Sequence, residues 1–239
     1  EPETARRIYH QYIDVDKDEN GTPTAIRFHD VEHFNFGFDV VDAIAAREPD
    51  RLAMLHLDRE KRERRFSFAD MRDLSNRCAN YFRALGVRRG DRVMLVLKRH
   101  WQFWPSILGL HKLGAIAIPA TCQLQEHDFE YRYNAAGVKA ILCTADGDTA
   151  HQAEMAARNA PTLETRILVG GSREGWRDFD AELSAYSAEY PRGEDAPGGD
   201  DLMLMFFTSG TTGYPKIAAH SFTYPLGHFH TAKYWHCVD

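Results

Sequence analysis

One nine-residue segment, 208–216, concentrates residue types that bind phosphate groups. Four of its residues carry an aliphatic hydroxyl group that can donate a hydrogen bond: Thr208, Ser209, Thr211 and Thr212. Gly210 and Gly213 permit backbone conformations that other residues avoid, and they let a ligand approach closely. Free backbone N–H groups in such a loop can form a concavity for an anion, and Lys216 adds one positive charge. The segment therefore suits a polyphosphate.

The segment differs from a Walker A loop, which has four residues between its glycines and ends in Gly-Lys-Ser or Gly-Lys-Thr. Here only Thr211 and Thr212 separate the glycines, and the lysine is followed by isoleucine. Pro215 prevents the loop from running directly into a helix, so we expect a short strand over 217–219. A turn that binds nothing is the alternative. The position of the segment after an apolar strand argues against it, because open parallel sheets bind ligands at the carboxyl ends of their strands.

The elements that must position this loop alternate along the chain. Apolar runs predict strands at 52–57, 93–97, 115–118, 140–143, 166–169 and 202–207. Helical spacing of apolar residues predicts helices at 71–85, 101–113, 126–136 and 150–158. Such alternation predicts βαβ units, and so an α/β fold with three layers and a largely parallel sheet.

The rest of the chain has a simpler expected organisation. We expect a polar segment over 1–37 that wraps the surface, one domain over 38–239, and a Pro-, Gly- and acid-rich connection at 189–201. Asp39 is expected to cap a helix that ends near residue 49. The charged run 58–65 is interpreted as the tip of a hairpin. A nucleic-acid patch is the alternative there, and the two glutamates in the run weaken it.

The composition argues against several classes of binding partner. The net charge of −6 gives the chain no global attraction for nucleic acid or an anionic membrane. No apolar run approaches the roughly 20 residues of a membrane-spanning helix. The four cysteines form no Cys-x-x-Cys pair, and the 12 histidines show no zinc-ligand spacing, so no metal site is expected. Scattered cysteines and the absence of a signal-peptide pattern favour a cytoplasmic protein.

The segment 208–216 resembles the phosphate loop of the adenylate-forming, or AMP-binding, enzymes, which include acyl-CoA synthetases, luciferases and the adenylation domains of peptide synthetases. Two weaker matches precede it in the expected order. Phe-Ser-Phe-Ala-Asp-Met at 66–71 resembles the first core block of that family, and Leu-Gly-Ala-Ile-Ala-Ile-Pro at 113–119 resembles the second. Segments 36–42 and 215–221 are most similar to the medium-chain acyl-CoA synthetases.

The resemblance implies two half-reactions that use ATP, Mg²⁺ and CoA. A carboxylic acid, here a medium-chain fatty acid, becomes an acyl-adenylate with release of pyrophosphate, and CoA then displaces AMP to give a thioester. The family's adenine-binding segment, magnesium-binding Glu, ribose-binding Asp, hinge and C-terminal domain with its catalytic Lys match nothing in these 239 residues. We therefore expect a truncated N-terminal portion that is inactive by itself and contains no catalytic residue.

Two further residues and two further functions remain open. His220 could approach the acid substrate or could be a structural residue at a strand end, and Trp235 could line an acyl pocket or belong to the core. The whole protein could instead bind nucleotide without catalysis, or could load a carrier protein rather than CoA. The acyl chain length and the oligomeric state are not predicted.

Overall fold

The computed structural model describes residues 8–209 and 213–236. Its centre is a seven-stranded sheet in the order β11-β10-β6-β5-β7-β8-β9. The strands are β5 (Arg92–Val96), β6 (Ile116–Pro119), β7 (Val138–Thr144), β8 (Thr165–Val169), β9 (Arg177–Asp178), β10 (Leu202–Thr208) and β11 (Lys216–Ser221). All neighbouring strands are parallel except β10 and β11. The predicted α/β fold with a largely parallel sheet is confirmed.

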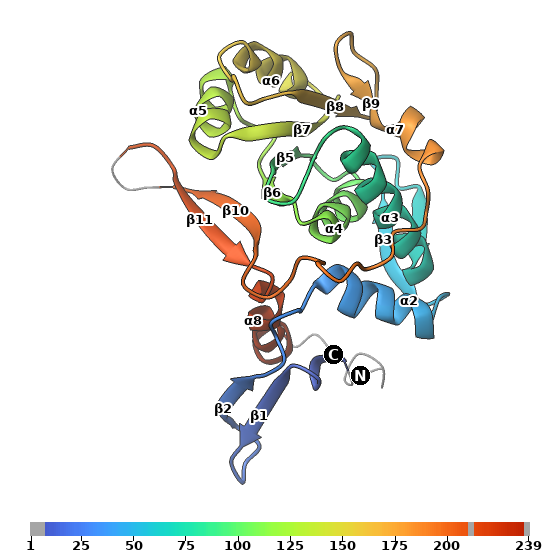
Figure 1. Ribbon diagram of the computed structural model, residues 1–239, viewed down its shortest axis with the longest axis vertical. Helices are drawn as coiled ribbons and strands as arrows, with labels where there is room; N and C mark the ends of the chain where they lie inside the picture. The colour runs from blue at the N-terminus through green and yellow to red at the C-terminus, as the bar shows by residue number, and fades with distance from the viewer. Residues whose placement is uncertain (1–7, 210–212, 237–239) are drawn as a thin grey trace.

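Helices cover both faces of this sheet, as Figure 1 shows. One layer holds α3 (Phe68–Ala84) and α4 (Phe103–Leu113), and the other holds α5 (Glu126–Ala136) and α6 (Thr149–Ala157). Strand β5 explains the two cores, because alternate side chains point to opposite faces. Val93 and Leu95 pack with α3 and α4, whereas Met94 and Val96 pack with α5 and α6.

Helices α3 and α4 approach each other closely at Gly109. A Cβ atom at this position would lie 2.6 Å from Cys78 Cβ and 2.8 Å from both the Ala79 nitrogen and the Ser75 oxygen. Only glycine leaves room for this backbone approach. Helix α3 begins with a capping box, in which Ser67 and Asp70 accept each other's backbone N–H groups.

Two hairpins flank the sheet. The predicted hairpin is confirmed, because β3 (Leu52–Leu57) pairs antiparallel with β4 (Glu63–Ser67). Ion pairs Arg62–Asp58 and Arg65–Glu63 neutralise part of its charged tip. A second hairpin, β1 (Ile13–Lys17) with β2 (Pro23–Phe28), lies within the segment that we expected only to wrap the surface.

The helix expected behind Asp39 is different from the prediction. A π-helical turn, η1 (Gly37–Asp42), follows Phe36 and continues into α2 (Ala43–Arg47). Asp39 therefore lies inside the turn rather than at its cap, and its carboxylate accepts the backbone N–H of Asn35 at 2.7 Å. The short elements α7 (Phe179–Glu182) and η2 (Leu183–Ala185) follow β9, and the predicted connection 189–201 contains neither helix nor strand.

The chain ends in the helical elements α8 (Tyr224–His230) and η3 (Thr231–Trp235). This end lies beside the N-terminal segment, as the red and blue ribbons of Figure 1 show. Leu226 of α8 is buried together with Ile8, Ile13 and Phe34. The first part of the chain therefore packs on the last part through an apolar cluster.

Candidate functional site

The hairpin of β10 and β11 carries the predicted phosphate loop at its tip. Thr208 and Lys216 are opposite each other in the strand register. The Thr208 hydroxyl donates a hydrogen bond to the Lys216 carbonyl oxygen at 3.4 Å. Because β10 is parallel to β6, the loop leaves the sheet at the edge where the carboxyl ends of the parallel strands lie. Open parallel sheets bind ligands at that edge.

The structure describes part of the predicted loop. Ser209 is exposed after β10. Gly213 has a φ of 123°, in a region that favours glycine, and a Cβ atom there would have no neighbour within 4 Å. Lys216 begins β11, where the sequence predicted a short strand, and it is exposed. The predicted residues Gly210, Thr211 and Thr212 lie outside the described residues.

Tyr131 of α5 lies against the carboxyl-terminal side of this loop. Its ring stacks on Tyr214 with 4.6 Å between the ring centroids. Its hydroxyl donates a hydrogen bond to the Pro215 carbonyl oxygen at 2.8 Å. Sequence reasoning missed this residue, because an aromatic residue in a helix is normally taken as part of the core.

His220, predicted as a possible substrate residue, forms part of a column of rings. Its ring centroid is 4.2 Å from that of Tyr224 and 5.8 Å from that of Phe206. Tyr224 in turn lies 4.4 Å from His228. The column joins β10 and β11 to α8, and His220 is half-buried within it.

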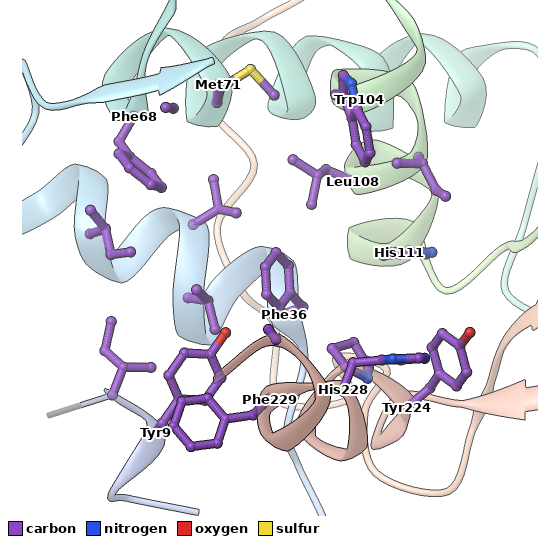
Figure 2. Close-up of a pocket in the computed structure, with 18 of the residues that line it drawn as sticks. Tyr9, Phe36, Phe68, Met71, Trp104, Leu108, His111, Tyr224, His228 and Phe229 are labelled. Carbon is purple, nitrogen blue, oxygen red and sulfur yellow. The ribbon is translucent and has the colours of Figure 1, made fainter. Parts of the chain in front are cut away.

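A cavity of about 1100 Å³ adjoins the α8 end of this column, where Tyr224 and His228 lie. Figure 2 shows its wall, formed by side chains from α3, α4, α8 and the segment around η1. Most of its lining residues are apolar, and they include Phe36, Val40, Phe68, Met71, Trp104, Leu108, Met203, Leu204 and Phe229. Tyr224 and His228 also line it, whereas His220 does not. The lining suits an apolar occupant.

Trp235, predicted as a possible residue of an acyl pocket, lies at the surface of the described part of the chain. Its side chain is 80 % exposed, and it is not among the residues that line the cavity. This exposure does not fit the alternative, a place in the core. Trp235 is the last residue of η3, and its helical spacing from Phe229 does not bury it.

A comparison with protein families decides the family. The AMP-binding enzyme family matches residues 41–237.

The chain belongs to this family.

Its relatives are acyl-CoA synthetases. The chain is 36 % identical over 197 residues to the mitochondrial acyl-coenzyme A synthetase ACSM1 of Mus musculus. This match covers 80 % of this chain and 34 % of that protein. The chain is also 36 % identical over 204 residues to the mitochondrial ACSM5 of Rattus norvegicus, covering 82 % of this chain and 35 % of that protein. The chain thus spans about a third of the length of these curated relatives.

Solved structures with the same fold include a CoA ligase. The anthranilate CoA ligase AuaEII, in complex with anthranoyl-AMP, has a TM-score of 0.70 and 26 % identity, covering 85 % of this chain and 37 % of that one. The N-terminal domain of FACL13 from Mycobacterium tuberculosis has a TM-score of 0.66 and 28 % identity, covering 79 % of this chain and 44 % of that one.

The described residues of this AMP-binding chain do not by themselves fit a metal. Among residues 8–209 and 213–236, no group of three or more His, Cys, Asp or Glu side chains could hold an ion. Mg²⁺ prefers carboxylates together with substrate phosphates, and the described part of the loop offers only hydroxyls and the Lys216 ammonium group. No helix in the described part of the chain is long and apolar enough to cross a membrane.

Proposed function

We propose that the complete protein is an ATP-dependent acyl-CoA synthetase. A carboxylate oxygen attacks the α-phosphorus of ATP, and the bond to pyrophosphate breaks, which gives an acyl-adenylate. The sulfur of CoA then attacks the acyl carbon, AMP leaves and the thiol proton passes to solvent. The family assignment and the names of the relatives support this proposal.

The observation that carries the proposal is the position of the phosphate loop. The loop connects β10 to β11 at the carboxyl edge of a parallel sheet, with Thr208 hydrogen-bonded to Lys216 at its base. We propose that Thr208, Ser209, Gly213 and Lys216 contact the β- and γ-phosphates, together with Gly210, Thr211 and Thr212, which lie outside the described residues. Hydroxyl donors and a fixed cation stabilise the charge that shifts onto pyrophosphate as the bond breaks.

We propose a medium-chain fatty acid as the carboxylic acid substrate. The segments at 36–42 and 215–221 support this choice, because they are most similar to the medium-chain acyl-CoA synthetases. We propose that His220 affects acid binding indirectly, by packing against Tyr224. The two rings are 4.2 Å apart, and Tyr224 lines the apolar cavity.

The experiment is to assay the complete protein with ATP, Mg²⁺, CoA and a series of acids from acetate to palmitate. Acyl-CoA and pyrophosphate are measured by mass spectrometry and a coupled assay. The proposal expects both products, with the highest kcat/KM for acids of medium length. Pyrophosphate release without acyl-CoA, and transfer to an added carrier protein, would favour a carrier-loading adenylation domain. Nucleotide binding without pyrophosphate release would favour a binding module.

We also propose that the 239 residues alone do not catalyse the formation of acyl-adenylate or acyl-CoA. The adenine, ribose, magnesium and lysine motifs of the family match no segment among them. The chain is assayed for pyrophosphate release with ATP, Mg²⁺ and octanoate, beside the complete protein as control. Turnover comparable to the complete protein would overturn this proposal.

We propose a reducing compartment for the protein, with the cytoplasm as the first candidate. Cys78 and Cys143 are buried free thiols and Cys122 is a half-buried one, which suits such a compartment. The relatives named above are called mitochondrial. Cell fractionation with an antibody against the protein separates the two locations, and recovery in the mitochondrial fraction would contradict the cytoplasmic one.

A further inference from the structure

Helix α5 holds the carboxyl-terminal side of the phosphate loop through one residue. The Tyr131 ring stacks on the Tyr214 ring at an interplanar angle of 20°. The Tyr131 hydroxyl donates to the carbonyl oxygen of Pro215, the residue that precedes Lys216. One side chain therefore contacts two successive residues immediately before the loop lysine.

The same side of α5 also contacts the strand that leads into the loop. The Tyr131 ring lies 6.1 Å from the Phe207 ring in an edge-on arrangement. The Arg132 guanidinium lies over the Phe207 ring, 5.2 Å from its centroid. Phe207 directly precedes Thr208, whose hydroxyl bonds to the Lys216 carbonyl oxygen. Tyr131 thus bridges the two strands at the base of the loop.

Tyr214 has little else to hold it, because 74 % of its surface is exposed. The hydrogen bond from Tyr131 acts on the Pro215 backbone, and the stacking acts on the Tyr214 side chain. The Pro215 ring already fixes one backbone dihedral angle. The start of β11 is thereby restrained on the α5 side as well as by its pairing with β10. A cation whose backbone is already ordered loses less conformational entropy when it binds an anion.

We propose that Tyr131 is a positioning residue that orients Lys216 toward the polyphosphate of ATP. It does not touch the phosphates itself; it holds the Tyr214–Pro215 backbone from which Lys216 extends. This inference rests on the proposed function, because it needs the loop to bind ATP. It adds a residue of α5, 84 positions before Pro215 in sequence, to the residues that determine nucleotide affinity.

The test measures the Kd of ATP for the complete protein by isothermal titration calorimetry. The first variant is Tyr131→Phe, which removes the hydroxyl and keeps the ring. The second is Tyr214→Ala, which removes the stacking partner at an exposed position and so leaves folding intact. The matched control is Tyr133→Phe on the same helix, whose hydroxyl donates to the Ala153 carbonyl oxygen at 3.3 Å, away from the loop.

We expect Tyr131→Phe and Tyr214→Ala each to raise the Kd of ATP by about three- to tenfold, the range for one neutral hydrogen bond or one aromatic pair. The KM for the acid should stay unchanged, and so should the thermal midpoint of Tyr214→Ala. Tyr133→Phe should lower the thermal midpoint and leave the Kd of ATP unchanged. A purely structural role for Tyr131 would instead lower the midpoint without moving the Kd.

Lys216→Ala tests the phosphate loop separately from the positioning role of Tyr131. If it raises the Kd of ATP and both tyrosine variants leave the Kd unchanged, the positioning role is wrong and the phosphate loop stands. If Lys216→Ala also leaves the Kd unchanged, the phosphate-loop assignment is wrong, and the role of Tyr131 falls with it.

Discussion

The ammonium nitrogen of Lys112 lies 2.7 Å from a carboxylate oxygen of Asp42, and the Lys112 side chain is fully buried. The same ammonium donates to the Ser75 hydroxyl at 2.9 Å and to the Asn76 side-chain oxygen at 2.7 Å. It also lies 5.5 Å from the centroid of the Phe38 ring. One lysine of α4 thus joins η1 and α3. Burial raises the pKa of Asp42 and lowers the pKa of Lys112, and each charge opposes the effect on the other.

Breaking this buried pair should be costly. Lys112→Met leaves the Asp42 carboxylate and the Asn76 oxygen without their partner, and we expect a loss of about 3–5 kcal/mol in the free energy of unfolding. Asp42→Asn leaves the fully buried Lys112 ammonium without its counter-charge, and we expect a loss in the same range. Urea unfolding followed by circular dichroism measures both.

The matched control is an exposed pair of the same type. Arg27 and Asp16 pair across the first hairpin, and their side chains are 57 % and 49 % exposed. Arg27→Gln should therefore destabilise the protein much less than Lys112→Met. Equal losses in Lys112→Met and Arg27→Gln would show that burial of the Lys112 pair has no special weight.

The approach of α3 and α4 gives a second prediction. Gly109→Ala would place a methyl group 2.6 Å from Cys78 Cβ and 2.8 Å from two backbone atoms. The helices must move apart, and we expect a loss of about 1–3 kcal/mol in the free energy of unfolding. Gly227→Ala in α8 is the control, since nothing lies within 4 Å of its Cβ position.

The control substitution should change the free energy of unfolding in the opposite direction. Alanine gains up to about 1 kcal/mol over glycine inside a helix, so Gly227→Ala should be neutral or stabilising. Thermal unfolding of both variants tests the pair. A Gly109→Ala protein as stable as Gly227→Ala would mean that α3 and α4 do not pack as closely as the structure indicates.

His111 should make stability depend on pH. Both ring nitrogens are buried, with no hydrogen-bond partner among the described residues. Burial lowers the pKa of His111 from 6.5 to about 3. Between those pH values the unfolded chain binds a proton at this residue and the folded chain does not. Stability is therefore fully present above about pH 6.5 and falls as the pH drops toward 3, by up to about 1.4 kcal/mol per pH unit.

The test compares the wild type with His111→Phe, which keeps a ring against Phe222, 5.9 Å away in the wild type. Urea midpoints are measured at each pH from 7 to 4. The free energy of unfolding of the variant should rise relative to the wild type by about 3 kcal/mol over this range. Parallel pH curves would show that His111 is accessible to protons in the folded state.

Local sequence determined much of the sheet. Apolar runs such as 140–143 lie inside strands that are buried on both faces, and such strands need no alternation. The hairpin of β1 and β2 gave no such signal, because every residue of β2 after Pro23 is exposed. The π-helical turn at η1 was missed for another reason. A run of apolar residues behind an aspartate predicts an α-helix with a cap, and one extra residue per turn leaves no mark in that pattern.

The candidate site divides in the same way. The loop 208–216 was readable because its glycines, hydroxyls and lysine are consecutive in the chain. Tyr131 was not readable, because its contact with Pro215 spans 84 residues and depends on how α5 packs beside the hairpin. The exposure of Trp235 could not be predicted from helical spacing, since spacing does not say whether another element covers that face of the helix.

The central claim is that the loop between β10 and β11 binds the polyphosphate of ATP through Lys216. Its most direct test is the Kd of ATP for the complete protein, measured by calorimetry for the wild type and for Lys216→Ala, together with the thermal midpoint of each. One charge-assisted contact contributes about 1.5–3 kcal/mol, so the Kd should rise roughly ten- to hundredfold. The midpoint should not change, because Lys216 is exposed at the start of β11. An unchanged Kd with a lowered midpoint would contradict the claim and leave Lys216 a structural residue of the hairpin.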